Sequence, residues 1–216
     1  TPTQTQTPTQ TPIHNEIILE YSETNSITIP LTKIGDGGVR VFASNFNNEY
    51  DESHNGNIEL SWDTVEPRIV RIVGDLKTFS NNSGSVTSAK KITKATIRGM
   101  QSLENVSNMF SYCENLSEVN LSEFDCTNIT NARSMFLDCK SLLTIQFNNP
   151  LTNIADLSFM FSGCLNLQSV NFSSTPVSYI ENLQSIFRDC KQLISVNIDG
   201  FATPYLQNLS SAFSGC

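Results

Sequence analysis

Hydrophobic and polar residues alternate in five short runs along the first third of the chain. Alternation with a period of two, in runs rich in β-branched residues, is typical of half-buried strands. Gly35, Gly37, Gly38 and the pair Asn55-Gly56 offer the positive-φ residues that turns between strands need. We therefore expect a small β-rich domain over residues 13–74 and a connecting loop over residues 75–91. The runs are 17–21 (IILEY), 26–31 (SITIPL), 39–44 (VRVFAS), 57–62 (NIELSW) and 68–73 (RIVRIV).

A second pattern, a sequence repeat, begins at Ile92. Cys113, Cys139, Cys164, Cys190 and Cys216 are spaced by 26, 25, 26 and 26 residues. A fixed period of this length predicts supersecondary units that stack and bury their apolar faces on one another. The copies that end at these cysteines are 102–113 (SLENVSNMFSYC), 128–139 (NITNARSMFLDC), 153–164 (NIADLSFMFSGC), 179–190 (YIENLQSIFRDC) and 205–216 (YLQNLSSAFSGC).

Each repeat has a half with strand spacing and a half with helical spacing. In the first half, the order L-x-x-V-x-L places Val119 and Leu121 on one face of a short strand and Asn120 and Ser122 on the other. In the second half, apolar residues at 129, 132, 135, 136 and 139 form a stripe along one side of a helical segment. An Asn or Asp stands where such a helix would begin, as N-caps prefer. These residues are Asn105, Asn131, Asp156, Asn182 and Asn208. The predicted fold class is therefore α+β, a solenoid of five copies over residues 92–216 with short parallel strands and short helical segments.

The pairs Met109-Phe110, Met135-Phe136 and Met160-Phe161 stand at one position of the repeat, and Ile186-Phe187 and Ala212-Phe213 are degenerate versions. With this Met-Phe-x-x-Cys signature, residues 92–216 resemble the BspA-like bacterial surface leucine-rich repeats. The resemblance implies a curved, leucine-rich-repeat-like solenoid with its strands inside, displayed at a cell surface or secreted. An adhesion role is implied by analogy alone.

Composition narrows the classes of partner. The chain has 216 residues, 38% of them apolar, which is enough for a real core. Its net charge of −8 leaves no basic footprint, so we expect neither nucleic acid nor anionic lipid as a partner. No apolar run reaches the roughly 18 residues that a membrane-spanning helix needs. Residues 1–12 contain only Thr, Pro and Gln, which predicts an extended linker or stalk. The start without Met and the stop inside a repeat suggest an excised fragment.

The cysteines are expected to be buried, reduced thiols. Stacked helical segments lie about 8 to 10 Å apart, whereas a disulfide needs Cα atoms within about 7 Å. Pairing would become feasible if this side of the stack compressed to the strand spacing of about 4.8 Å. Cys126 stands outside the repeated positions.

We expect no metal, cofactor or catalytic site. There is no CxxC, and His14 and His54 lie away from the repeats. Residues 51–57 begin like a calcium loop, but its twelfth position is Trp62, where a carboxylate is required. No GxSxG turn occurs, and the repeats hold no histidine that could serve as a base for a nucleophile.

The polar face of the strands remains as a candidate binding surface. Stacking would align Thr96 with Asn120, Gln146, Asn171 and Asn197 in one row, and Arg98 with Ser122, Asn148, Ser173 and Asp199 in another. Amides both donate and accept hydrogen bonds, which suits carbohydrate or a peptide backbone. Alternatively, amides in register bond to one another and only stabilise the sheet. The candidate ligand-binding residues are Asn120, Gln146, Asn171, Asn197, Asn148, Ser122 and Ser173.

The function expected from these patterns is non-catalytic. It is a surface-displayed binding or adhesion module that recognises protein or carbohydrate through the strand face of the solenoid, in an extracellular or cell-surface location. The alternative is a structural or assembly component of a surface layer, appendage or virion, in which copies of the chain contact one another. The uncapped end of a stack of repeats fits either function.

Overall fold

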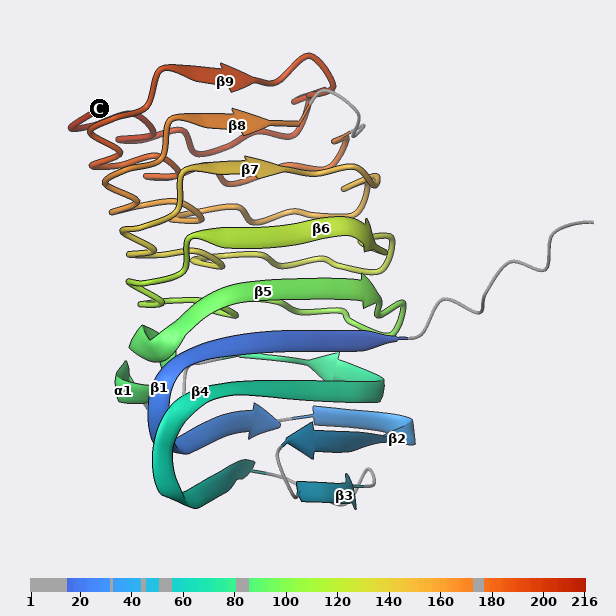
Figure 1. Ribbon diagram of the computed structural model, residues 1–216. Coiled ribbons are helices and arrows are strands. Elements are labelled where there is room, and N and C mark those ends of the chain that lie inside the picture. The colour runs from blue at the N-terminus through green and yellow to red at the C-terminus, as the bar shows by residue number, and fades with distance from the viewer. Residues whose placement is uncertain (1–14, 32, 44–45, 51–55, 81–85, 173–176) are drawn as a thin grey trace, which may run out of the picture.

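The structure is a computed structural model that describes residues 15–31, 33–43, 46–50, 56–80, 86–172 and 177–216. Nearly all the regular secondary structure in these residues is β-strand. Figure 1 shows the elements in chain order. The elements are β1 (Glu16–Leu31), β2 (Lys33–Ala43), β3 (Phe46–Tyr50), β4 (Gly56–Thr78), α1 (Val86–Lys91), β5 (Ile92–Gly99), β6 (Glu118–Phe124), β7 (Thr144–Gln146), β8 (Ser169–Asn171) and β9 (Ser195–Asn197).

The first six strands belong to one sheet of order β3-β2-β4-β1-β5-β6. The five predicted runs do form strands, but the two runs 17–21 and 26–31 join into β1, and 57–62 and 68–73 join into β4. Their antiparallel register continues past irregularities between Tyr21 and Ser26, which is why two runs make one bent strand. Gly35, Gly37 and Gly38 lie within β2, where the register shifts between Ile34 and Val39, and not in a turn between strands.

The sheet runs from the N-terminal strands into the repeats without a break. β5 pairs antiparallel with β1 on one side and parallel with β6 on the other. Residues 75–91, predicted as a loop, contain the end of β4 and the whole of α1. One hydrophobic cluster includes both Ile72 of β4 and Phe136 of the repeats. The division of the chain into separate domains stays a prediction.

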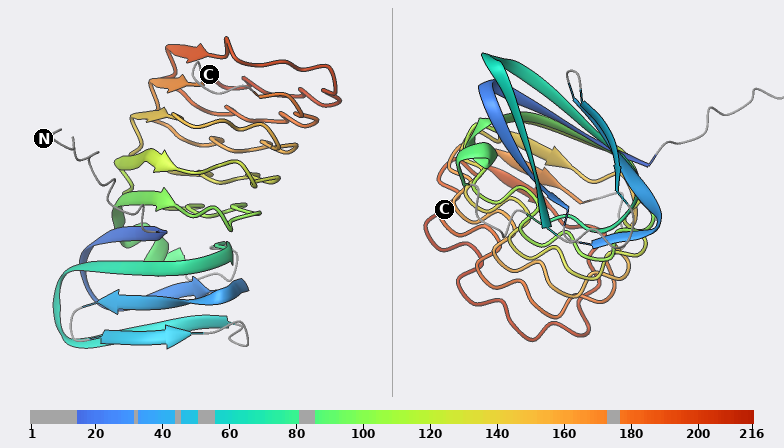
Figure 2. Two further views of the ribbon diagram at one scale, coloured as in Figure 1. Left: turned by 90° about the vertical axis from the view of Figure 1, so that its right-hand side faces the viewer. Right: turned by 90° about the horizontal axis from the view of Figure 1, so that it is seen from below.

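Successive repeats lie on one another in register. We number them first to fifth as residues 92–113, 114–139, 140–164, 165–190 and 191–216. In the last three, Gln146, Asn171 and Asn197 are aligned by parallel pairing of β7, β8 and β9. A second row of parallel bridges joins the equivalent Asn or Asp residues 105, 131, 156, 182 and 208. Figure 2 shows the result, flattened coils with all their strands on one side.

The predicted α+β fold class is wrong, because the structure is almost all β, with 43% of the described residues in strands and 3% in helix. Among the described residues the only α-helix, α1, precedes the repeats. The segments expected to be helical are turns, and their backbone explains why. Two positions in each repeat have positive φ, as at Ser134 (55°) and Asp138 (57°), and a left-handed residue at every fourth position cannot continue a right-handed helix. The equivalent pairs are Asn108 and Tyr112, Phe159 and Gly163, Ser185 and Asp189, and Ser211 and Gly215.

Hydrogen bonds between repeats replace those of a helix. The N–H of Ser134 donates to the carbonyl of Ser158 in the next repeat at 2.9 Å, whereas the N–H of Leu137 donates locally to Ser134 at 3.1 Å. The predicted N-cap residues make the expected kind of bond in a different structure. The Asn131 side-chain oxygen, for example, accepts the N–H of Arg133 at 2.9 Å and closes a turn.

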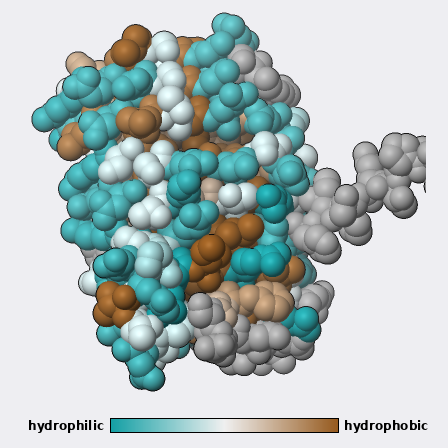
Figure 3. All heavy atoms as spheres, viewed as in Figure 1, coloured by the Kyte–Doolittle hydropathy of each residue, from teal (hydrophilic) through white to brown (hydrophobic). Residues whose placement is uncertain are grey.

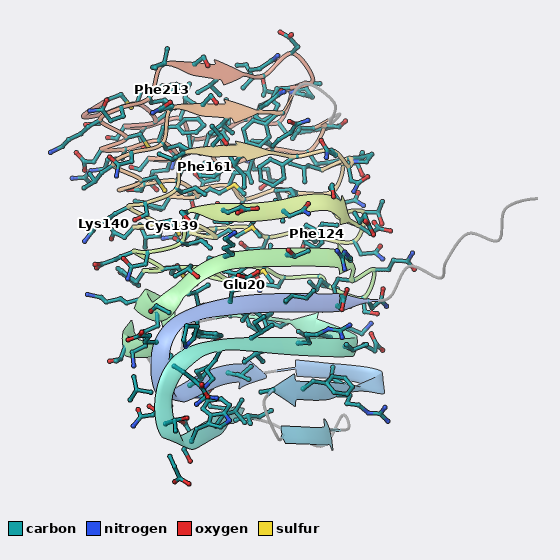
Figure 4. All side chains as sticks on the ribbon, in the orientation of Figure 1. Glu20, Phe124, Cys139, Lys140, Phe161 and Phe213 are labelled. Atoms are coloured by element: carbon teal, nitrogen blue, oxygen red, sulfur yellow. The ribbon has the colours of Figure 1, made fainter. Side chains whose placement is uncertain are left out.

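The predicted apolar stripe is confirmed as core. Phe110, Phe136, Phe161 and Phe187 are buried, and neighbouring ring centroids lie 5.5 to 5.6 Å apart. Phe213, which was also expected in the core, stacks on Phe187 but is 54% exposed. In Figure 4, Cys139 and Phe161 point into the stack and Lys140 points out at its margin.

The thiols are free, as expected, although the spacing used to predict this was wrong. Repeats held by backbone hydrogen bonds and stacked rings lie much closer than packed helices, near the strand spacing. In the second to fifth repeats, Sγ of the repeated cysteine donates instead to a phenylalanine carbonyl of the preceding repeat, at 3.1 Å from Cys139 to Phe110 and 3.0 Å from Cys190 to Phe161. Five of the six thiols are buried, Cys126 among them, and Cys216 is exposed.

Candidate functional site

The structure brings most of the predicted binding residues together on the outer face of the strands. Thr96 of β5 is aligned with Asn120 of β6, and Gln146, Asn171 and Asn197 are aligned across β7, β8 and β9. β6 and β7 lie beside each other in Figure 1, although they belong to different sheets. We call Asn120, Gln146, Asn171 and Asn197 the amide row.

Members of the amide row are turned toward solvent to different degrees. Asn120 and Gln146 are exposed, and Asn171 and Asn197 are half-buried. The side-chain oxygens of Asn120 and Asn197 accept the backbone N–H groups of Ser122 and Asp199, each at 3.0 Å. These bonds orient the two side chains, and they leave the amide nitrogens to serve as donors.

The second predicted row is less complete, because a register shift after Thr96 aligns Arg98 with Glu123 and not with Ser122. Ser122 and Asn148 are exposed, and Asn148 accepts a hydrogen bond of 2.7 Å from Gln146 Nε2. Ser173 lies outside the described residues. The side-chain hydrogen bonds of Asn120, Gln146 and Asn197 thus join residues of the same repeat. The alternative in which the amides only stabilise the sheet predicts side-chain bonds from one strand to the next.

Charged residues border the amide row on β1, β4 and β5. The buried Glu16 carboxylate accepts hydrogen bonds from Arg71 and from Arg98, both at 2.7 Å. Burial raises the pKa of Glu16, but the hydrogen bonds and charges of the two guanidinium groups outweigh it, so the pKa lies below its usual range. Lys94 pairs with Glu118 at 2.9 Å, which raises the Lys94 pKa. These cations are matched by carboxylates, and Figure 3 shows that polar residues predominate on this face.

The thiols are poor nucleophiles in these surroundings. Burial raises the pKa of Cys139 and Cys164 well above the usual thiol value and that of Cys190 to about 12. They are therefore protonated at neutral pH, which suits their role as hydrogen-bond donors to carbonyls. Their place is in the core.

The candidate calcium loop and both histidines fall outside what can be described. His14 and residues 51–55, which include His54, are not among the described residues. In the described ranges, no three His, Cys, Asp or Glu side chains are grouped so that they could hold a metal ion.

A second polar feature, which the sequence analysis missed, crosses the third, fourth and fifth repeats. It is a groove of about 340 Å³ lined by Ala155, Asp156, Glu181, Asn182, Gln207 and Asn208. Two residues before Glu181 and Gln207 stand Tyr179 and Tyr205, whose rings are stacked with centroids 5.4 Å apart. The signal in the sequence is a tyrosine at the same position of two successive repeats, where the two preceding copies have asparagine.

Comparison with known proteins adds a family. A family model described as "Mycoplasma protein of unknown function, DUF285" matches residues 45–169 and 104–216, and the two overlapping matches cover all five repeats from Ile92 onward. No curated protein matches the chain, and neither does any solved structure. In the described part of the chain no helix is both long and apolar enough to span a membrane.

Proposed function

We propose a binding function for this chain, which belongs to the family described as Mycoplasma protein of unknown function, DUF285. In this proposal the chain is a non-catalytic module that recognises a protein or carbohydrate ligand through the strand face of its repeats. Its ligand would be met outside the cell, at a surface on which the module is displayed.

The amide row carries this proposal. Four amide side chains occupy one position of four successive repeats on the outer face of paired strands. Because the oxygens of Asn120 and Asn197 are held by their own strands, their N–H groups are oriented before a ligand arrives. Such preorganisation lowers the entropy cost of binding, and the donors suit hydroxyl or carbonyl oxygens.

Two further observations support the non-catalytic and surface parts of the proposal. In the first four repeats the most repeated reactive group, the cysteine thiol, is buried with a raised pKa, so there it is not available as a nucleophile. The Met-Phe-x-x-Cys signature also resembles the BspA-like surface repeats, for which display outside the cell is typical.

A glycan array and a peptide array probed with the full chain test this function. We expect at least one ligand whose binding is lost in the double variant Asn120→Ala and Asn171→Ala. The matched control is Asn166→Ala, because Asn166 is an exposed asparagine of the fourth repeat outside the amide row. If the double variant binds as well as the unaltered chain, the strand face is not the recognition surface.

Assembly with copies of the chain is a second candidate function. An apolar cavity of about 280 Å³ near the fifth repeat is lined in part by Phe187, Ile198 and Phe213. Light scattering across a concentration series separates the two candidates, because ordered growth in mass favours assembly and a constant monomer mass favours ligand binding.

A further inference from the structure

The groove across the last three repeats differs from the amide row in its chemistry. Its six lining residues include two carboxylates, three amides and no cation. The amide row lies on the strands, whereas the groove lies on the segments that follow them along each coil, where the parallel bridges between Asp156, Asn182 and Asn208 run.

A pair of exposed aromatic rings lies next to this groove in the chain. Tyr179 and Tyr205 stack with an interplanar angle of 5°, yet they are 55% and 54% exposed. Ile180 between Tyr179 and Glu181 is fully buried, so the two flanking side chains point outward on the same side of the extended segment. The tyrosine pair and the carboxylate therefore share one surface.

The second and third repeats carry asparagine at the position of Tyr179 and Tyr205. This asparagine has a structural role that tyrosine does not fill. Asn128 Nδ2 donates to the carbonyl of Gln101 at 2.9 Å, and Asn153 Nδ2 donates to Thr127 at 2.6 Å, so each asparagine ties its coil to the one before. In the fourth and fifth repeats this amide bridge is replaced by a ring that stays more than half exposed. Large exposed apolar surface of this kind marks a binding site more often than a stabilising element.

The polar groups of the groove are partly engaged and partly available. Asp156 Oδ1 accepts the N–H of Ser158 at 2.7 Å, and Asn182 Oδ1 accepts the N–H of Gln184 at 3.0 Å. Among the described residues, the Glu181 carboxylate and the Asn182 amide nitrogen have no partner. The groove thus presents both acceptors and donors, of which Asp156 and Asn182 are oriented by their own turns, next to a flat aromatic surface.

We propose that the tyrosine pair and the groove form a binding site for an uncharged carbohydrate. A pyranose ring has a face of C–H groups, which packs on the tyrosine rings, and a rim of hydroxyls, each of which donates and accepts. The carboxylates accept from these hydroxyls and the amides donate to them. Sulfated or sialylated glycans are disfavoured, because Asp156 and Glu181 repel anions and the lining residues include no Lys or Arg.

This site goes beyond the proposed function, because it uses residues that the strand face does not contain. Variants therefore separate the two. Tyr179→Asn and Tyr205→Asn install the residue that the second and third repeats carry at this position. We therefore expect these variants to preserve the stacking of the repeats on one another. Asn120→Ala with Asn171→Ala alters the strand face alone.

The test is isothermal titration of the full chain with four probes. Three are neutral hexasaccharides, namely cellohexaose, chitohexaose and a mannohexaose, and the fourth is a sulfated heparin hexasaccharide. We expect at least one neutral probe to bind and heparin not to bind. The double variant Tyr179→Asn and Tyr205→Asn should weaken binding about tenfold or more. Its melting curve by circular dichroism should match that of the unaltered chain, and the strand-face variant should bind the sugar as before.

Several outcomes would overturn the proposal. The first is that no neutral probe at millimolar concentration gives a heat of binding. The second is that the double tyrosine variant binds a neutral probe as tightly as the unaltered chain, and the third is that heparin binds more tightly than the neutral probes. A peptide with the sequence of residues 1–12 and the nucleoside adenosine serve as further probes, since proline-rich segments and nucleobases also stack on aromatic rings. If either binds through the tyrosines and the sugars do not, the site is for that class of ligand.

Discussion

The N-terminal strands share one sheet with the strands of the first two repeats, but the N-terminal region and the repeats are held together in different ways. β1 and β4 are long antiparallel strands of 16 and 23 residues, and Glu16 at the start of β1 is aligned with both Val73 and Arg98. In the last three repeats, strands of three residues are stacked on the equivalent residues of the next copy. The first region thus depends on contacts between distant parts of the chain, and the second on contacts between neighbouring copies.

The interiors differ as well. The N-terminal region buries charge, at Glu16 between two arginines and at Arg68, whose guanidinium lies 4.5 Å from the Trp62 ring centroid. The repeats bury columns of identical side chains, the phenylalanine rings and the thiols. A column confines the effect of a substitution to adjacent copies, as in other repeat proteins. A bent antiparallel sheet instead couples every strand at once.

The largest effect is expected from the phenylalanine column. Phe136→Ala removes a fully buried ring that stacks on both Phe110 and Phe161, so it should cost about 3 to 5 kcal/mol of unfolding free energy in urea titrations. Hydrogen exchange should accelerate in the second repeat and its neighbours more than in β1 and β4. Ile72→Ala in β4 is the matched control. If hydrogen exchange accelerated equally in all parts of the chain in both variants, the distinction between the two regions would be wrong.

A smaller effect is expected at Gly163, where the third repeat lies close to the second. Gly163 has a φ of 75°, and a Cβ there would clash with Asp138 Oδ1 of the preceding repeat. Gly163→Ala should therefore cost about 2 to 3 kcal/mol, through backbone strain and displacement of the carboxylate. Adding Asp138→Gly should recover part of this loss in the same urea titration. A double variant as unstable as the sum of the two single variants would exclude the contact.

The pairing of buried Glu16 with Arg71 and Arg98 should make the stability of the N-terminal region depend on pH. Because the pKa of Glu16 in the folded protein lies below the usual value of 4.5, its stabilising contribution is complete above that value. The contribution is lost as the pH falls through the folded pKa. Glu16→Gln should cost about 1 to 2 kcal/mol at neutral pH, because charged hydrogen bonds to Arg71 and Arg98 are lost.

The measurement is the midpoint of thermal unfolding between pH 3 and pH 7 for both proteins. The difference between them should shrink toward acidic pH. Glu118→Gln, which alters the exposed pair with Lys94, is the control and should leave the midpoint nearly unchanged at every pH. A difference that grows toward acidic pH would contradict the assigned direction of the pKa shift.

The smallest effect is expected on the outer face of the repeats. Gln146→Ala removes an exposed side chain whose amide bonds only to Asn148, so it should cost under about 1 kcal/mol. Urea titration of this variant beside Phe136→Ala compares outside with inside. Similar losses in the two variants would mean that the assignment of the buried and exposed faces is wrong.

Much of the repeat region could be predicted because the pattern occurs five times. The burial of the apolar stripe at Ile129, Met135 and Cys139, and the exposure of Asn120 and Ser122, follow from spacing alone. The groove could not be predicted in this way, because its lining residues come from three copies and are not identical in them. The tyrosine pair was visible only as a departure from the asparagine at that position.

The amino-acid sequence determined by itself where each repeat begins, which side chains of the apolar stripe are buried in the first four repeats and which Asn or Asp oxygens bind backbone N–H groups. These follow from local spacing and from short-range chemistry. The tertiary structure decided whether the second half of each repeat is helix or turn, because the positive φ of Ser134 and Asp138 accompanies N–H groups that donate to the next repeat. It also decided that β5 joins the N-terminal strands to the repeats, since hydrogen bonds between distant segments leave no periodic trace in a sequence.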